Sequence, residues 1–143
     1  MKDNMKILVP VDGSPVSCRA AAFAGEIASV TGGTIDLLFV SSMKPDHSAA
    51  EQRFIPVEQL VASMQDPKEI FDGAKKNIPA GVPVSAHEKN GIPAAEIVAF
   101  AKATGSDLIV IGSKGLNAVE GFLLGSVSQK VVENEDASVL IVK

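Results

Sequence analysis

The sequence predicts an α/β fold, a doubly wound parallel sheet of five strands with helices on both faces. Short apolar runs alternate with amphipathic stretches in the order βαβαβαβαβ, and such alternation is typical of a parallel sheet covered by helices. The runs are nearly continuous in apolar residues, as are strands buried on both faces. With the first strand at the centre and right-handed crossovers, the strand order is 3-2-1-4-5.

The composition fits a single domain spanning residues 1–143 and limits the classes of partner that it could bind. Apolar residues make up 46% and charged residues 21%, an ordinary globular mixture. The net charge of −4 argues against a nucleic-acid partner, because phosphate backbones require a basic face. No run approaches the roughly 20 apolar residues of a membrane span, and no secretory signal is recognised. We therefore expect a cytoplasmic protein, whose start is either Met1 or Met5.

Two strands flanking a helix with clear ends are expected first. The first strand covers residues 6–11, with Pro10 near its end because proline cannot donate to a ladder. Ser14 is a good N-cap for the helix and Pro15 a good first residue, and Gly32-Gly33 ends it. The second strand covers residues 34–40. The apolar face of the helix has three- and four-residue spacing: Ala20, Phe23, Ala24, Ile27, Ala28 and Thr31.

A polar excursion and a helix follow. Residues 41–56 have no period, and residues 57–64 suggest a short helix. A separate helix then begins, because Asp66 can cap it, Pro67 can open it and Glu69 stands at the capping-box position. Its core-facing residues are Ile70, Phe71 and Ala74, and it ends by residues 78–79.

The second half repeats the strand–helix alternation. The third strand covers residues 82–88, the fourth residues 107–111 and the last residues 139–142, with alternation in the third at Val82, Val84 and Ala86. A helix opens at Gly91-Ile92-Pro93, carries Ala94, Ile97, Val98 and Ala101 on one face, and stops at residues 104–106. The last helix covers residues 126–135 and turns Val127, Val131 and Val132 inward.

A ligand site is expected beyond the carboxyl ends of the strands, at the switch point of strand order. Residues 11–14, residues 40–41 and the loop from Gly112 all follow strands there. The loop has the glycine spacing G-x2-G-x9-G-S, and its third glycine precedes a helix. Gly-rich loops that lead into a helix N-terminus hold phosphate in α/β proteins. Neither a P-loop nor a dinucleotide fingerprint is present.

These motifs resemble the universal stress protein family over the whole chain. The resemblance rests on residues 9–14 (VPVDGS), on Gly91 before a Pro-Ala helix start, and on the pattern from Gly112 to Ser128. The last matches the nucleotide-binding branch of that family. The resemblance implies a Rossmann-like fold and a cytoplasmic, homodimeric regulatory protein of the stress response. The implied ligand is ATP, or ADP or AMP, with Mg²⁺ or Mn²⁺ carried by the phosphates.

The resemblance also implies roles for individual residues. Asp12, next to Pro10, would face the adenosine, and backbone groups of Val11 and Val40 would hold the adenine. The loop residues would serve the ribose and phosphates, with Lys114 within reach of a terminal phosphate. These loop residues are Gly112, Lys114, Gly115, Gly125, Ser126, Val127 and Ser128.

Structural roles for the same residues stay open. Asp12 could cap the turn before the first helix, and Ser126 and Ser128 could be N-cap residues. Gly112 and Gly115 could be turn glycines, and Lys114 a solvated loop residue. The spaced set favours a ligand site over these separate explanations.

Catalysis and structural metal binding have no candidate residues. His47 and His87 have no Cys or carboxylate cluster at ligand spacing. No Ser-His-acid or Cys-His set is placed on strand ends. The single cysteine, Cys18, falls in a predicted helix and is expected to be a buried structural thiol. At most weak ATP hydrolysis is expected.

The last strand predicts the assembly. Residues 139–142 are continuously apolar and are expected at a sheet edge, where an uncovered strand pairs with something. We expect a homodimer in which two copies of Val139–Val142 pair antiparallel about a two-fold axis. A dimeric interaction or protective module of the same fold, binding no nucleotide, is the alternative function. A nucleotidyl-transferase or ATP-pyrophosphatase enzyme is disfavoured, because its first-strand motifs are missing.

Overall fold

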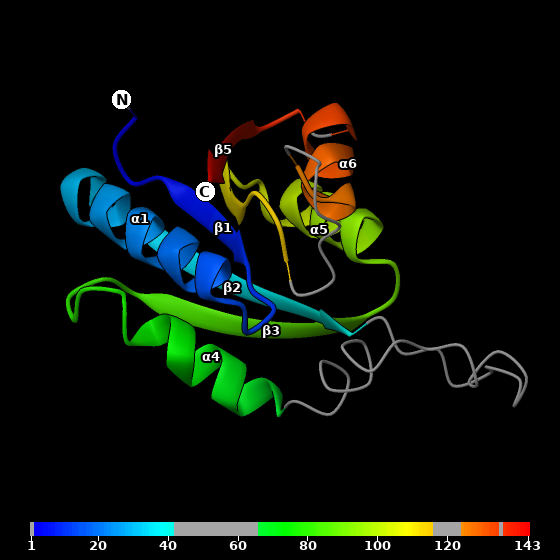
Figure 1. Ribbon diagram of the computed structural model, residues 1–143. Helices are drawn as coiled ribbons and strands as arrows, with labels where there is room; N and C mark the ends of the chain where they lie inside the picture. The colour runs from blue at the N-terminus through cyan, green and yellow to red at the C-terminus, as the bar shows by residue number, and fades with distance from the viewer. Residues whose placement is uncertain (1, 42–65, 116–123, 135) are drawn as a thin grey trace, which may run out of the picture.

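The predicted architecture is confirmed by the computed structural model, which describes residues 2–41, 66–115, 124–134 and 136–143. Five parallel strands form one sheet in the order β3-β2-β1-β4-β5 (Figure 1). The strands are β1 (Lys6–Pro10), β2 (Thr34–Ser41), β3 (Val84–Asn90), β4 (Leu108–Gly112) and β5 (Ser138–Val142). The described helices are α1 (Pro15–Thr31), α4 (Pro67–Lys75), α5 (Pro93–Thr104) and α6 (Ser126–Asn134).

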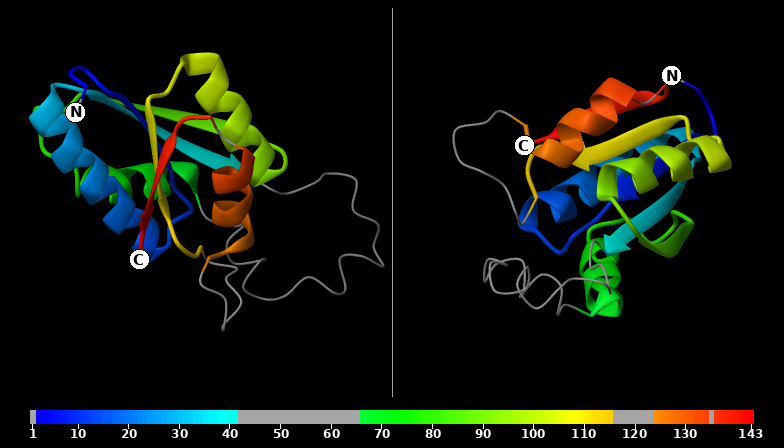
Figure 2. Two further views of the ribbon diagram at one scale, coloured as in Figure 1. Left: turned by 90° about the horizontal axis from the view of Figure 1, so that it is seen from above. Right: turned by 90° about the vertical axis from the view of Figure 1, so that its right-hand side faces the viewer.

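Helices cover both faces of the sheet, and each face has its own apolar core (Figure 2). Helices α1 and α4 pack on one face, against residues such as Val9, Leu37 and Val110. Helices α5 and α6 pack on the other, where Leu8 and Ile109 are fully buried. Strands β1, β2 and β4 therefore have neighbours on every side, which explains their continuous apolar runs.

Helix α1 begins and ends where expected, but its buried face differs from the prediction. The Ser14 hydroxyl accepts from Ser17 N at 3.3 Å, and Gly32 ends the helix with φ of 69°. Phe23 is 50% exposed, so its placement on the apolar face is wrong. The buried residues are small, and a Cβ on Gly25 would lie only 2.7 Å from Pro79 Cδ. A helix packed this closely leaves no room for a phenyl ring on its inner face.

Other boundaries shift by one or two residues. Strand β3 begins at Val84 rather than residue 82, because Val82 N is bonded to Pro79 O in a turn.

Three side chains are more exposed than expected. Ala86 is exposed, contrary to its expected alternation, since β3 is an edge strand. On α6, Val131 is fully buried, but Val132 is 44% exposed and does not turn inward. Cys18 is partly buried in α1 rather than buried.

The remaining helix starts agree with expectation. Asp66 caps α4 through its side chain, which accepts from Lys68 N, and Pro67 is the first residue. Gly105 ends α5 in the left-handed conformation. The excursion and short helix expected before Asp66 lie outside the described residues. No helix in the described part of the chain has the length and apolar character needed to span a bilayer.

Asp107 ties the N-terminal segment to the amino end of the sheet. Its carboxylate accepts from Lys2 Nζ at 2.7 Å and from the backbone N of Lys6 at 2.9 Å. The hydrogen bond from Lys2, followed by that from Lys6, lowers the pKa of Asp107 below its usual range.

Replacement of Asp107 by asparagine should therefore weaken the fold at neutral pH more than in acid. A carboxyl with a lowered folded-state pKa adds stability above its unfolded pKa, and this is lost as pH falls through the folded pKa. We expect a loss of about 1 kcal/mol or less at pH 7, shrinking below about pH 4. Urea unfolding between pH 2.5 and 7 measures it. Asp3→Asn, an exposed carboxylate in the same segment, is the matched control and should show no such pH-dependent difference.

Candidate functional site

Three chain segments meet at the carboxyl ends of the central strands. Strand β1 lies between β2 and β4 in the sheet, so the turn after Pro10 lies between the ends of the other two. The turn and the β4 loop are in direct contact, because a Cβ added to Gly115 would collide with Asp12 Oδ2. The structure thus brings together the two halves of the site predicted from residues 11–14 and from the loop at Gly112.

The turn after β1 orients Asp12. Oδ1 of Asp12 accepts from Ser14 N at 2.9 Å, an Asx turn that leads into the N-cap of α1. The expected capping role of Asp12 is thus present, and its second oxygen still faces the β4 loop. The carboxylate is consequently held in place before any ligand arrives.

The backbone of the adenine-side residues is partly occupied. Val11 N donates to Leu38 O at 2.9 Å and extends the β1–β2 ladder. Val11 could therefore offer its carbonyl, but not this amide, to a ligand. Val40 pairs with Lys89 of β3, two residues beyond the Pro10–Leu38 pair that ends β1. The backbone of Val40 consequently has no neighbour in β1 on that side.

Three hydrogen bonds join the entrance and exit of the β4 loop, and a fourth joins the entrance to the end of β5. Ser113 N donates to Val142 O at 2.7 Å, and Gly125 N donates to Ser113 O at 2.6 Å. The Ser128 hydroxyl donates to Gly112 O at 2.7 Å and to Ser113 O at 3.3 Å. We call residues 112–113 and 125–128, joined in this way, the loop neck.

The first turn of α6 opens beside the loop neck. The first helical N–H with a partner one turn back is that of Gln129, which donates to Gly125 O at 3.0 Å. The N–H groups of Ser126, Val127 and Ser128 precede it and have no acceptor within the helix. Together with the helix dipole they favour an anion at this position. The Gly125 amide, by contrast, is already used.

The three glycines of the motif differ in what demands them. A Cβ on Gly112 would lie 2.8 Å from Val16 Cγ1, so this glycine lets β4 pack against α1. Gly115 must lack a side chain because a Cβ there would collide with Asp12 Oδ2. A Cβ on Gly125 would meet only ordinary contacts, 3.4 Å from Ser113 O and 3.5 Å from Lys114 Cα. Of the three, Gly125 alone has no steric reason within the described chain to be glycine.

The side chains around this turn have different surroundings. Ser126 is exposed, whereas Val127 is partly buried and packs against the α5–α6 core. Ser128 is only 3% exposed. Lys114 is partly buried and makes no ion pair with the described residues. A ligand could thus meet the hydroxyl of Ser126 and the ammonium of Lys114, but of Val127 mainly the backbone.

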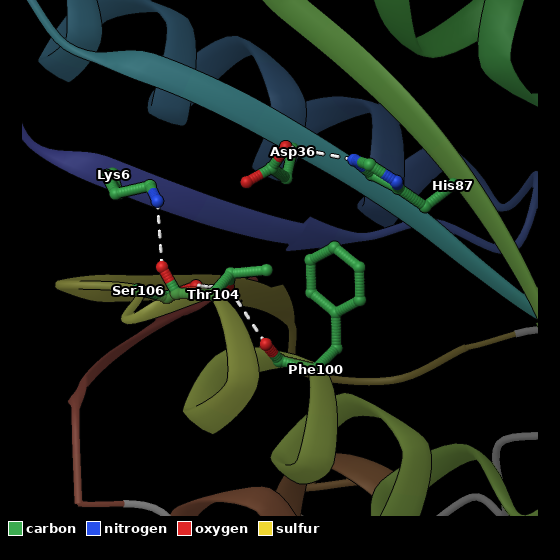
Figure 3. A network of polar contacts seen from close by, with 6 residues as sticks. All are labelled: Lys6, Asp36, His87, Phe100, Thr104 and Ser106. Carbon is green, nitrogen blue, oxygen red and sulfur yellow. Dashed lines mark hydrogen bonds and ion pairs between the residues drawn. The ribbon is translucent and has the colours of Figure 1, made fainter.

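A second polar cluster lies away from this site, toward the C-terminal end of α5 (Figure 3). His87 Nε2 is 3.0 Å from Asp36 Oδ1, and the His87 ring packs against Phe100 with centroids 4.8 Å apart. Lys6 Nζ donates to Thr104 O at 2.8 Å. Among the described residues, no three His, Cys, Asp or Glu side chains gather where they could hold a metal. The cluster fastens α5 to the sheet.

The sequence indicates that Asp36 needs a polar partner, but it does not identify that partner as His87. Asp36 interrupts the apolar run of residues 34–40, and a carboxylate in a central strand needs a polar partner. The partner is 51 residues away, on the neighbouring strand. Which residue becomes the partner of Asp36 depends on the strand register. That register pairs Leu38 with His87 and Asp36 with Ser85.

Comparisons with known proteins agree with this fold. The model of the universal stress protein family matches residues 4–143. Universal stress protein MJ0531 of Methanocaldococcus jannaschii is 35% identical over 140 residues, covering 96% of this chain and 81% of that protein. The structure of UspA from Lactobacillus plantarum superimposes with a TM-score of 0.82 at 25% identity, covering 100% of both chains. A universal stress protein solved in complex with cAMP superimposes with a TM-score of 0.67 at 26% identity, covering 99% and 98% of the two chains.

Proposed function

Because the chain belongs to the universal stress protein family, we propose that it is a cytoplasmic, ATP-binding regulator of the stress response. The observation that carries this proposal is the first turn of α6. Three N–H groups without helical acceptors lie beside Gly125, a glycine that the described chain itself does not require. The cAMP complex of a related protein supports an adenine nucleotide as the ligand class.

The proposed ligand spans both halves of the site. The phosphates lie at the N–H groups of Ser126, Val127 and Ser128, with the Lys114 ammonium adding positive charge. Mg²⁺ or Mn²⁺ is held by the phosphates rather than by a protein cluster. The adenosine lies over the β1 and β2 ends, against Pro10, Val11, Asp12 and Val40. Gly112 and Gly115 allow the turn and the loop to close around the ribose.

Slow or absent hydrolysis is part of the proposal. The carboxylate that the described residues bring to this site is Asp12, which is oriented by Ser14 N in the turn after β1. A general base must lie within hydrogen-bond reach of the attacking water, and that water must be in line with the terminal phosphate. Asp12 is instead proposed to lie on the adenosine side. A nucleotide that stays intact suits a regulator that responds to occupancy.

We also propose a homodimer joined through β5. Strand β5 has one neighbour in the described sheet, β4, and its sequence SVLIV contains no charge. In Figure 2, left, the strand runs uncovered across the view. The other edge strand, β3, carries His87, Glu88 and Lys89, and charged side chains discourage edge pairing. The uncharged edge is the one suited to a second copy.

The nucleotide part of the proposal predicts a simple spectrum. The chain contains no Trp and no Tyr, so the pure protein should absorb almost nothing at 280 nm. A co-purified adenine nucleotide would dominate the spectrum near 260 nm, and mass spectrometry would identify it as ATP, ADP or AMP. We expect a bound nucleotide, or measurable heat on titrating nucleotide-free protein with Mg-ATP. Absence of both would favour the alternative function, a dimeric interaction module that binds no nucleotide.

A further inference from the structure

The hydroxyl of Ser128 contacts the protein backbone. Ser128 is only 3% exposed, and its Oγ donates to Gly112 O at 2.7 Å and Ser113 O at 3.3 Å. These acceptors stand 16 and 15 residues earlier in the chain, at the end of β4. A hydroxyl has one hydrogen to donate. With that hydrogen shared between two carbonyls, a phosphate oxygen could receive it only if these bonds broke.

The same bonds determine where α6 begins. Ser113 O accepts from Gly125 N as well as from Ser128 Oγ, and Ser113 N is fixed to Val142 O of β5. The first turn of α6 is thus tied to the β4 end by one backbone amide and one side-chain hydroxyl. The free N–H groups of that turn can point at a ligand only while these ties hold them in place.

We propose that Ser128 is a positioning residue that closes the loop neck, and that its hydroxyl is not a phosphate ligand. The part of the inference that concerns ligands rests on the proposed function, whereas the part that concerns the neck does not. Removing the hydroxyl takes this buried donor away from Gly112 O and Ser113 O and weakens the hold of α6 on the end of β4. The neck then opens more often, and the N–H groups of α6 lose their fixed direction.

Amide hydrogen exchange of the nucleotide-free protein tests the neck directly. In Ser128→Ala we expect the Gly125 amide to exchange about tenfold faster than in the parent chain, because one tie of the neck is lost. Ser128→Thr, which keeps the hydroxyl, should restore slow exchange. If alanine does not fold, Ser128→Cys replaces it, because a thiol of similar size donates only weakly.

A matched serine elsewhere controls for general destabilisation. Ser17 is 5% exposed, and its hydroxyl donates to Ser14 O at 2.9 Å in the first turn of α1. Ser17→Ala removes a comparable buried hydrogen bond and should leave the Gly125 exchange rate unchanged. Ser126→Ala, at an exposed hydroxyl, should lower the affinity for Mg-ATP with no change in exchange.

Exchange and affinity together decide the inference. Faster Gly125 exchange with about tenfold weaker Mg-ATP binding in Ser128→Ala supports a positioning role. Unchanged exchange with weaker binding would overturn it and make the hydroxyl a direct phosphate ligand. If no variant, nor the parent chain, binds Mg-ATP, the proposed function fails, while the exchange result still decides whether Ser128 closes the neck.

Discussion

Replacing Gly125 by valine is expected to lower the affinity for Mg-ATP at least about a hundredfold, or ~2.7 kcal/mol, while the domain stays folded. A Cβ at this position would make only ordinary contacts within the described chain, at 3.4 Å or more. The branched side chain would instead occupy space beside the first turn of α6, where the phosphates are proposed to lie. Isothermal titration calorimetry measures the binding, and thermal unfolding confirms the fold.

Gly112→Ala is the matched comparison and should lower the stability of the domain. Its Cβ would approach Val16 Cγ1 to 2.8 Å, so the Val16 side chain, α1 or β4 must shift. Overpacking of this kind costs about 1–3 kcal/mol, which thermal unfolding would register as a lower midpoint. Unchanged binding in Gly125→Val would place the phosphates elsewhere. A destabilisation in Gly125→Val as large as that in Gly112→Ala would show that residue 125 also has an internal steric role.

The fold could be predicted because its signals are local and agree with one another. Ser14 and Pro15 at the start of α1, Asp66 and Pro67 at the start of α4, and Gly105 at the end of α5 are capping signals readable from a few residues. Continuous apolar runs marked the strands buried on both faces. Alternation of the two element types indicated a doubly wound parallel sheet, and with the first strand at its centre the predicted order is the one found.

The roles of single residues in the site depend on distances that no local pattern contains. Gly112 could be recognised as a close-approach glycine, but not as one that approaches Val16. Ser128 stands where an N-terminal hydroxyl is expected to face a ligand, yet its partners are Gly112 O and Ser113 O. Phe23 followed the helical period but is 50% exposed, because the inner face of α1 is made of small, closely packed residues. In each case the contacts come from tertiary packing, which the sequence pattern does not contain.

Val139→Lys should convert the proposed homodimer to a monomer at micromolar concentration, raising its dissociation constant at least about a hundredfold. Val139 is a partly buried residue of β5, whose outer edge has no partner in the described sheet. A lysine on an edge strand discourages pairing. Because a two-fold interface presents the same patch twice, both copies would carry the charge. Sedimentation velocity between about 1 and 100 µM measures the effect.

A second substitution avoids the core that Val139 contacts. Phe23 is 50% exposed and stands one helical turn after Arg19, whose Nε donates to Lys143 O directly after β5. Residues four apart share a helix face, so Phe23 lies on the β5 side of α1. Phe23→Glu should therefore also weaken a dimer built through β5, with little effect on thermal stability.

The opposite edge of the sheet provides the control. Ala86 is exposed on β3, and Ala86→Lys makes the same kind of change on an edge strand that already carries His87, Glu88 and Lys89. The oligomeric state should stay that of the parent chain. A monomeric parent at these concentrations would remove the dimer proposal, and dissociation by Ala86→Lys alone would move the interface to β3. If Val139→Lys and Phe23→Glu dissociate the dimer and Ala86→Lys does not, the two copies are joined through the β5 edge. This is the edge whose strand carries no charged side chain to discourage pairing with a second strand.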